Sequence, residues 1–564
     1  MTPMTTGGST SRELDRFDYA VCVALWLGYV ALLLSTVKDL GYARDEGFYF
    51  QAARSYEAWF QLLHTDLPRA FEPSTIDRYW SANHEHPAFM KSLFALSHRY
   101  LFESFRIFRE QGTAYRFPGM AVSALGVAVT YAWGRRELGR LAGLVAALSL
   151  AFMPRVFFHS HLACFDTPVM TMLLLTAYAY ARSLEAGLGW AVATGVLYGL
   201  LLDTKHNAWL LPGAFALHFL LTRGAHAVRE LRVGRVAIPS AFFAMLVISP
   251  LVFYVGWPWI WHDTARRLAE YVAFHLGHEY YNMEFLGQTY WKPPMPRLYA
   301  WVMTLGTVPG ITLALFGVGL VVSVMARVAP WRRYVAELAP AEQVTPARSL
   351  HAESSTPLLW LLCLAMCYAP WWSTATPIFG GTKHWITAYP FLCLFAGRGF
   401  AFAAGRIAQL VPWQRLAPFT PQGLAACVLV GPLCMMLHSN PWGLSFYTPL
   451  VGGAPGAASL GLNRTFWGYT TGAVQGFLNA QAPPHASVYV HDTALQSWEM
   501  LRDDGRVRED LRGSLAIAGS SLALYHHEPH MHRVEYEVWV DYGHDAPADV
   551  GTFDGVPVIW VYER

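Results

Sequence analysis

Residues 19–38, with the sequence YAVCVALWLGYVALLLSTVK, form an apolar run that is long enough to cross a bilayer. A spanning helix needs about 20 mostly apolar residues. The run is longer than the apolar part of a secretory signal and has no clear small-residue cleavage site, so we expect it to stay as a helix. Further apolar runs follow at 117–133, 140–158, 167–182, 189–203, 207–222, 236–256, 300–325, 356–372, 385–403 and 418–438. The sequence therefore predicts an α-helical polytopic membrane protein with about 11 transmembrane helices.

The composition of the chain supports a membrane location. Of its 564 residues, 54% are hydrophobic and only 14% are charged, whereas soluble domains average about 25% charged residues. Much of the surface must therefore face something other than water. The net charge of +2 gives no argument for nucleic acid as a partner. The cysteines lie almost entirely in apolar runs, a pattern that indicates neither a disulfide framework nor a cysteine-based zinc site.

Arginine residues are unevenly divided among the loops. The arginine-rich loops lie at 135–140, 182–189, 223–235, 327–348 and 405–415. Because Lys- and Arg-rich loops stay in the cytoplasm, the sequence predicts a cytoplasmic N-terminus. The alternate loops, beginning with 39–116, then lie outside, and they carry most of the residues suited to enzyme chemistry.

The last part of the chain differs from the rest. Residues 439–564 are polar, contain no spanning run, and carry strand-like stretches at Ser487–Val490, Leu522–Tyr525 and Pro557–Tyr562. The sequence thus predicts two parts, a transmembrane catalytic domain over 1–438 and a small extracytoplasmic α/β domain over 439–564.

Two adjacent carboxylates, Asp45 and Glu46, follow directly on the first apolar run. Neighbouring residues on a helix point about 100° apart, so only one of them is expected to face a given cleft. A solvated acidic turn is the alternative. We favour a catalytic role, because a carboxylate beside Arg44 at the membrane surface suits a general base.

Two other acidic positions have competing explanations. The segment His84-Glu85-His86-Pro87 suits a divalent cation or a substrate, or simply a polar loop before a helix that begins with proline. Asp166, ahead of Thr167-Pro168, suits either catalysis and metal binding or the N-cap of the next helix.

The tripeptide Thr-Lys-His occurs in two short outer loops, with Lys205-His206 in one and Lys383-His384 in the other. A single interfacial lysine is explained by a side chain that reaches toward water. Two such segments at the same membrane level favour the binding of a phosphate at the headgroup layer.

Together these residues resemble the polytopic GT-C glycosyltransferases of family 39, which include protein O-mannosyltransferases and lipid A aminoarabinose transferases. The likeness covers roughly residues 15–400 and rests on Asp45-Glu46, His84-Glu85-His86-Pro87, Asp166 and Lys205. Where the aminoarabinose transferases have Glu-x-Pro-Pro, this chain has Glu-His-Pro-Ala. The resemblance implies a bacterial inner-membrane enzyme with Asp45 as its base. Such an enzyme passes a sugar from a polyprenyl-phosphate carrier to a hydroxyl group on the outer face.

The reaction that the resemblance implies is an inverting hexosyl or pentosyl transfer to a protein or glycolipid hydroxyl. Asp45, Glu46 and Asp166 are the catalytic candidates. Lys205, His206, Lys383 and His384 are expected to hold the carrier phosphate, and Glu85 and His86 to contact the substrate. The alternative is a transporter or flippase of cell-envelope glycolipids, although such proteins tend to use internal repeats and charges at the bilayer midplane. The sequence leaves the sugar, the acceptor and any need for a divalent cation open.

Overall fold

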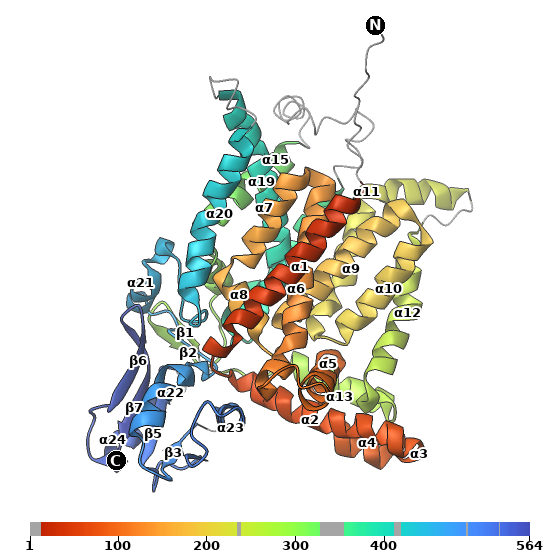
Figure 1. Cartoon of the computed structure of the whole chain (residues 1–564). Helices are drawn as coiled ribbons and strands as arrows, with labels where there is room; N and C mark the ends of the chain where they lie inside the picture. Colours follow the sequence, from red (N-terminus) through yellow and green to blue (C-terminus); the bar gives the residue numbers. More distant parts are fainter. Residues whose placement is uncertain are drawn as a thin grey trace.

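The computed structural model describes residues 13–233, 238–281, 283–326, 355–410, 419–491, 494–528 and 531–564. Figure 1 shows a bundle of long helices with a layer of shorter helices and a β-sheet at one end. The arginine-rich loop 327–348 lies outside the described residues, as do parts of the loops 223–235 and 405–415.

Every apolar run predicted from the sequence overlaps a helix or a bent pair of helices. These elements are α1 (Arg16–Thr36), α6 (Gln111–Leu138), α7 (Arg140–Ala151) with α8 (Pro154–His161), α9 (Asp166–Ala186), α10 (Leu188–Leu202), α11 (Leu211–Arg232), α12 (Ser240–Gly256), α14 (Tyr299–Thr307) with α15 (Gly310–Met325), α18 (Thr356–Tyr368), α19 (Tyr389–Leu410) and α20 (Thr420–Ser439). By length and composition, 4 of the described helices can cross a membrane, or up to 6 if each bent pair is one span. The number of about 11 spans therefore stays a prediction.

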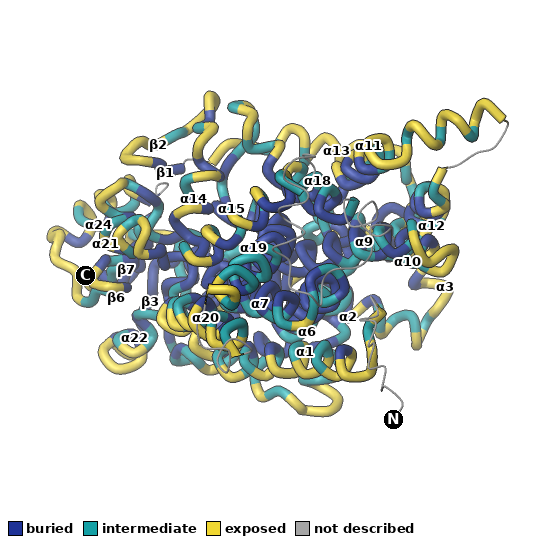
Figure 2. The backbone as a smooth tube through the Cα atoms, turned by 90° about the horizontal axis from the view of Figure 1, so that it is seen from above, coloured by how far each residue is buried: buried dark blue, intermediate teal, exposed yellow. Residues whose placement is uncertain are grey.

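The centre of the bundle is formed by α6, α7, α9 and α19, and α1 lies on its outside (Figure 2). Small residues let the central backbones approach one another. A Cβ atom added to Gly399 of α19 would lie 1.9 Å from the Leu315 carbonyl oxygen of α15, so only glycine fits there. Close contact through small residues is typical of helix packing in membranes.

The two ends of the bundle differ in character. At the end where α1 begins, Asp18 binds Arg135 and Arg140, each at 2.9 Å. The sheet lies at the opposite end (Figure 1). The first residues of α1 and the C-terminal part thus lie at opposite ends, and the assignment of one end to the cytoplasm remains a prediction.

A layer made of the long helix α2 and several shorter helices lies at the same end as the sheet. It comprises α2 (Arg44–Thr65), α3 (Leu67–Ala70), α4 (Pro73–Trp80), α5 (Phe89–Ser97) and α13 (Thr264–Leu276), and a hairpin of β1 (Met283–Phe285) and β2 (Gln288–Tyr290) lies in the same long loop as α13. Aromatic side chains anchor α2 on this layer. Tyr56 stacks on Trp80 at 3.9 Å, and Trp59 meets the same ring edge-on at 5.1 Å. This packing holds the first turn of α2 in a fixed place at the end of the bundle.

The C-terminal part contains a five-stranded sheet in the order β4-β3-β5-β7-β6. Its strands are β3 (Ser487–Tyr489), β4 (Arg512–Ser514), β5 (Leu522–His526), β6 (Asp549–Phe553) and β7 (Val556–Glu563), with α22 (Gln475–Gln481), α23 (Leu495–Asp503) and α24 (His532–Tyr542) beside them. The three strands predicted from the sequence coincide with β3, β5 and β7. Whether 439–564 is a separate domain stays a prediction.

The C-terminal part lies in close contact with the start of α2. A Cβ atom added to Gly41 would meet the Tyr469 carbonyl oxygen at 2.2 Å, and one added to Gly47 would meet Gln496 at 2.5 Å. Ser497 also donates to the Ala43 carbonyl at 2.8 Å. These contacts place the first turn of α2 between the bundle and the sheet.

Candidate active site

A cavity of about 250 Å³ opens beside the first turn of α2. Segments far apart in the sequence line it, from the first loop, the loop after α10, α13 and the loop before α19. The residues predicted from the sequence that line this cavity are Asp45, Glu85, His86, Lys205, His206, Lys383 and His384. Glu46 and Asp166 were also predicted, and they lie next to the cavity without lining it.

The adjacent carboxylates at the start of α2 point to different surroundings. Asp45 lines the cavity, and its side chain is 17% exposed. Glu46 is completely buried and binds Arg116 of α6 through two hydrogen bonds of 2.7 Å. The backbone N–H groups of Ala43 and Ala163 also donate to it, at 2.8 and 2.9 Å. Since these partners occupy both of its oxygens, Glu46 fixes the helix start, and Asp45 is the carboxylate presented to a ligand.

Two cations hold Asp45. Lys383 Nζ donates to its Oδ2 atom at 3.3 Å, and Arg44 Nε donates to Oδ1 at 3.2 Å. Burial by itself would raise the pKa of Asp45, but the positive charges of Lys383 and Arg44 outweigh it and hold the pKa below the usual range. Asp45 is therefore ionised at neutral pH, as a proton acceptor must be.

A second ion pair lies deeper in the same region. Lys205 Nζ donates to Asp166 Oδ1 at 2.7 Å, and His159 lies 3.4 Å from the other oxygen of that carboxylate. Lys205 lines the cavity, whereas the Asp166 side chain is only 4% exposed. Asp166 therefore orients the Lys205 ammonium from the side that faces away from the cavity.

The turn that carries Glu85 and His86 is fixed by a buried lysine. Lys91 Nζ donates to the carbonyl oxygens of Asn83 and His86 at 2.6 and 2.8 Å. Burial lowers the pKa of Lys91 to about 7. Asn83, Glu85 and His86 all line the cavity. The first loop thus supplies a rigid wall.

Imidazole rings form another part of the lining. His206 packs on His275 with ring centroids 4.0 Å apart, and His86 lies 5.6 Å from the same ring. Burial and neighbouring positive charges hold the pKa of each of these three rings below the ordinary histidine value. The Nδ1 atoms of His86 and His206 are buried and have no hydrogen-bond partner. Neutral rings with unused polar atoms are suited to sugar hydroxyl groups.

His384 is held by the backbone. The N–H groups of Phe379 and Gly380 donate to its Nε2 atom at 3.3 and 3.0 Å, and the Trp371 ring packs on it at 4.5 Å. An imidazole nitrogen that accepts two hydrogen bonds carries no proton, so His384 is neutral. It shapes the loop beside Lys383 and does not add a charge for a phosphate.

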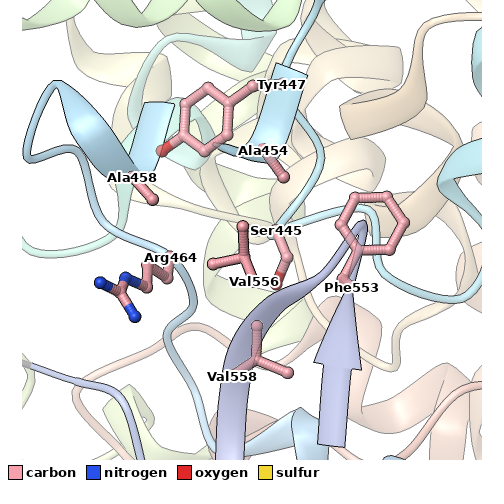
Figure 3. A pocket seen from close by; sticks show the side chains of 8 residues that line it. All are labelled: Ser445, Tyr447, Ala454, Ala458, Arg464, Phe553, Val556 and Val558. Atoms are coloured by element: carbon pink, nitrogen blue, oxygen red, sulfur yellow. The ribbon is translucent and has the colours of Figure 1, made fainter. Parts of the chain in front are cut away.

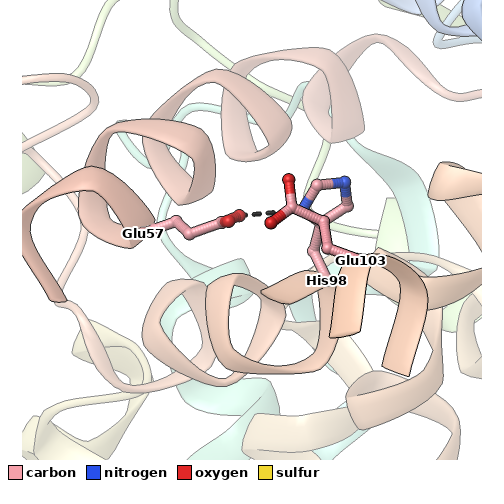
Figure 4. Close-up of side chains that lie close together, drawn as sticks. All are labelled: Glu57, His98 and Glu103. Carbon is pink, nitrogen blue, oxygen red and sulfur yellow. Dashed lines mark hydrogen bonds and ion pairs between the residues drawn. The ribbon is translucent and has the colours of Figure 1, made fainter. Parts of the chain in front are cut away.

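Metal binding at His84, Glu85 and His86 gains no support from the geometry. Among the described residues, the one group of three or more possible ligands with atoms close enough for a metal ion is Glu57, His98 and Glu103, between α2 and the helical segment His98–Ser104 that follows α5 (Figure 4). There His98 binds Glu57 at 2.8 Å, and Arg99 lies 3.9 Å from the same carboxylate. A nearby arginine already supplies the positive charge, so we interpret this group as an ion-pair network.

A second hollow lies within the C-terminal part, where Tyr447, Arg464, Phe553 and Val558 are among the residues that surround it (Figure 3). It has no room for a water-sized molecule. The cavity beside Asp45 is therefore the better candidate site.

Several residues of the site were missed by the sequence analysis, among them His275, Arg116 and Trp467. Arg116 lies just before an apolar run, and a charge at that position was a usable signal. Trp467 lies in the C-terminal part, and its ring covers the Lys383 ammonium with Nζ 4.2 Å from the ring centroid. Nothing in the sequence connects Lys383 with Trp467, because the two residues meet only when the C-terminal part packs against the rest of the chain.

Comparison with known proteins gives one family match. Residues 99–254 match the model of the family described as dolichyl-phosphate-mannose-protein mannosyltransferase. No curated protein matches the chain in sequence.

Solved structures show a general likeness. The ArnT protein of Cupriavidus metallidurans bound to undecaprenyl phosphate is 15% identical, with a TM-score of 0.46 and coverage of 97% of each chain. The archaeal oligosaccharyltransferase AglB from Archaeoglobus fulgidus, in complex with an inhibitory peptide and a dolichol-phosphate, is 10% identical with a TM-score of 0.44. That match covers 89% of this chain and 66% of the other. Because both TM-scores lie below 0.5, the proposals below rest on the geometry of this chain. The family match confirms the predicted resemblance to the polytopic GT-C glycosyltransferases, since over residues 99–254 the chain is similar to the dolichyl-phosphate-mannose-protein mannosyltransferases.

Proposed function

We propose that this chain is a membrane glycosyltransferase that uses a polyprenyl-phosphate-linked sugar. It transfers a hexosyl or pentosyl group, with inversion, to a hydroxyl group of a protein or glycolipid on the outer face of a bacterial inner membrane. The observation that carries the proposal is the ionised Asp45 beside Lys383, in a cavity that Lys205 also lines.

The base in this reaction is Asp45. Its carboxylate takes the proton of the acceptor hydroxyl, and the acceptor oxygen then forms a bond to the anomeric carbon of the sugar. The bond between that carbon and the carrier phosphate breaks, and its electron pair leaves with the phosphate oxygen. Positioned general bases typically contribute 10²–10⁴-fold to a rate.

The leaving phosphate is stabilised by the two lysines. Negative charge grows on the phosphate as the bond breaks, and fixed positive charges at that place lower the barrier. Lys205 and Lys383 both line the cavity, and each is oriented by a carboxylate. Arg44, Lys205 and Lys383 lie beside Asp45 and Asp166, and Glu85 is a further acid of the lining. The phosphate would therefore be held by the position of the two ammonium groups and not by a net positive charge.

Binding of the donor would also prepare the base. Lys383 and Arg44 hold the pKa of Asp45 low, which makes this carboxylate a weak base. A carrier phosphate would draw the Lys383 ammonium toward itself. Asp45 would then lose part of its stabilisation, and its pKa would rise toward neutral, where a general base works best. The donor would thus activate the base.

The neutral part of the cavity suits the sugar. Tyr49, Phe274 and Tyr281 offer aromatic faces, and the buried Nδ1 atoms of His86 and His206 offer hydrogen bonds. Aromatic faces with a few polar atoms are typical of sites for small polar ligands.

A transporter or flippase is the weaker alternative. Transporters place ionisable residues near the bilayer midplane. Here the cavity is lined by α2, α13 and short loops, and these helices lie in the layer at one end of the bundle (Figure 1).

The proposal is tested with purified protein in liposomes that contain polyprenyl-phosphate sugars labelled in the sugar. We expect release of free polyprenyl phosphate together with a labelled acceptor. Mass spectrometry of glycoproteins and glycolipids from a deletion strain then identifies the acceptor. Movement of intact donor across the bilayer without bond cleavage would contradict the proposal and favour the flippase.

A further inference from the structure

The ammonium group of Lys383 lies between two aromatic rings. Its Nζ atom is 4.2 Å from the centroid of Trp467 and 5.1 Å from that of Phe379. A tryptophan face attracts a cation, and the attraction strengthens where water is excluded. Lys383 is only 6% exposed, so the contact with Trp467 is largely dry.

The backbone at Trp467 adopts a conformation that is rare for a large side chain. Its φ angle is +76°, and the next residue, Gly468, has a φ angle of +64°. Bulky residues with positive φ are genuine outliers, and they persist only where the surroundings fix them, which happens mostly at functional sites.

The surroundings of Trp467 connect the sheet to α2. Its carbonyl oxygen accepts a hydrogen bond of 2.8 Å from the backbone N–H of Arg44, the residue before Asp45. On the other side, the Gly468 N–H donates to Glu528 Oε1 at 2.8 Å, just after β5. Both hydrogen bonds are made by the peptide group between Trp467 and Gly468. Its oxygen faces the residue before the proposed base, and its N–H faces a residue just after β5.

We infer that Trp467 is a positioning residue of the proposed reaction, through which the C-terminal part of the chain holds the Lys383 ammonium beside Asp45. This inference rests on the proposed function. The ring is 4% exposed and also meets His159 edge-on, with centroids 5.6 Å apart. Packing alone would explain the burial, but it does not account for the ring face over the ammonium or for the backbone bond to Arg44.

The charged groups around this contact decide what its loss would do. Lys383 and Arg44 bind Asp45, Asp166 lies near both Asp45 and Lys383, and Lys205 repels Lys383. Burial lowers the pKa of Lys383, so the ammonium gains hydration if the ring is removed. The ammonium would then move toward water and hold Asp45 less well. The pKa of Lys383 would rise, and so would that of Asp45.

The test compares Trp467→Ala with Trp467→Phe, which keeps an aromatic face. Trp539→Ala in α24 serves as the control in the same part of the chain. Turnover of a polyprenyl-phosphate sugar is measured against pH in proteoliposomes with equal amounts of protein. For Trp467→Ala we expect turnover to fall roughly tenfold and the acid limb of the pH profile to move to higher pH. Trp467→Phe should restore most of the activity, and Trp539→Ala should behave like the wild type.

A second measurement does not depend on turnover. Competitive acetylation of lysines at several pH values, read by mass spectrometry, reports the titration of Lys383 in the intact protein. We expect it to shift to higher pH in Trp467→Ala. If the titration of Lys383 is the same in Trp467→Ala as in the wild type, the inference is overturned. It is also overturned if Trp467→Ala is less stable but keeps the acid limb of the wild-type pH profile. A wild-type protein that turns over no donor would defeat the proposed function, and the acetylation result would still decide the role of Trp467.

Discussion

The two Asp–Lys pairs at the cavity are built in opposite ways. In the pair Asp45–Lys383, the carboxylate lines the cavity and is 17% exposed, while its lysine is covered by aromatic rings and only 6% exposed. In the pair Asp166–Lys205, the lysine is the more open partner at 15%, and the carboxylate is 4% exposed. The ion pairs measure 3.3 and 2.7 Å, respectively.

This difference separates two tasks within one cluster of charges. The looser pair presents an ionised carboxylate that can accept a proton. The tighter pair presents an ammonium that can bind a phosphate. Removing one partner of a buried ion pair leaves the charge of the other uncompensated. In each pair, replacing the aspartate should therefore have a different effect on the protein from replacing the lysine.

The largest effect is expected from the replacement of Asp45. Asp45→Asn is nearly isosteric but cannot take the acceptor proton, so turnover should fall by at least about a hundredfold. Asp166→Asn should raise the donor KM by roughly tenfold, because Lys205 loses the charge that orients it. Both are measured as initial rates at equal membrane abundance, with the exposed Asp545→Asn as the matched control. If Asp166→Asn had no turnover and Asp45→Asn had normal turnover, the roles of the two carboxylates would have to be exchanged.

The second prediction concerns Lys383→Met, which keeps an apolar stem and removes the charge. Turnover should fall by roughly tenfold or more, since a charge-assisted hydrogen bond to the phosphate is lost. Asp45 also loses the ammonium that lowers its pKa. Because Asp45 must be ionised to act, the acid limb of kcat/KM should move to higher pH. A wild-type pH profile in this variant would remove Lys383 from the site.

Lys205→Met should act mainly on the donor. This lysine does not contact Asp45, so the base keeps its charge and the pH profile should stay as in the wild type, whereas kcat should fall because a charge that stabilises the leaving phosphate is lost. The KM for the polyprenyl-phosphate sugar should rise by roughly tenfold. The measurement is a full saturation curve with the donor at fixed acceptor concentration. Wild-type values of both kcat and KM in this variant would remove Lys205 from the phosphate site.

Glu46→Gln should have the smallest effect on turnover. Its side chain keeps an oxygen for Arg116, but a buried arginine loses its counter-charge. We expect lower thermal stability and lower abundance in the membrane, with almost normal turnover per folded molecule. Fluorescence-detected thermal unfolding combined with an activity assay separates the two quantities. Loss of turnover in a fully stable protein would return Glu46 to the catalytic group.

Much of the fold follows from the sequence, because apolar runs of spanning length have few alternatives in water or in lipid. The break between α14 and α15 was not predicted, since one apolar run continues through Pro309. In the C-terminal part, β4 and β6 were missed because their sequences, Arg-Gly-Ser and Asp-Val-Gly-Thr-Phe, contain no run of apolar residues. Short strands that pair with distant neighbours leave little periodicity to detect.

For the site, the sequence could identify candidate residues but not most of the contacts that their side chains make. The helix period correctly predicted that only one of Asp45 and Glu46 would face the cavity. The two Thr-Lys-His segments do bring Lys205 and Lys383 to one cavity. The sequence could not show that His384 would accept two backbone hydrogen bonds, nor that Trp467 would cover Lys383. Both depend on contacts between segments that only the packed fold brings together.

The most direct test of the account is the affinity for polyprenyl phosphate in the Asp45→Asn variant. Asparagine removes the negative charge that competes with a phosphate for Lys383. We expect Asp45→Asn, in lipid nanodiscs, to bind polyprenyl phosphate at least as tightly as the wild type while its sugar transfer falls by at least about a hundredfold, and we expect Lys205→Met to bind it more weakly. Weaker binding by Asp45→Asn, or sugar transfer by it at a normal rate, would contradict the assignment of a base beside a phosphate site.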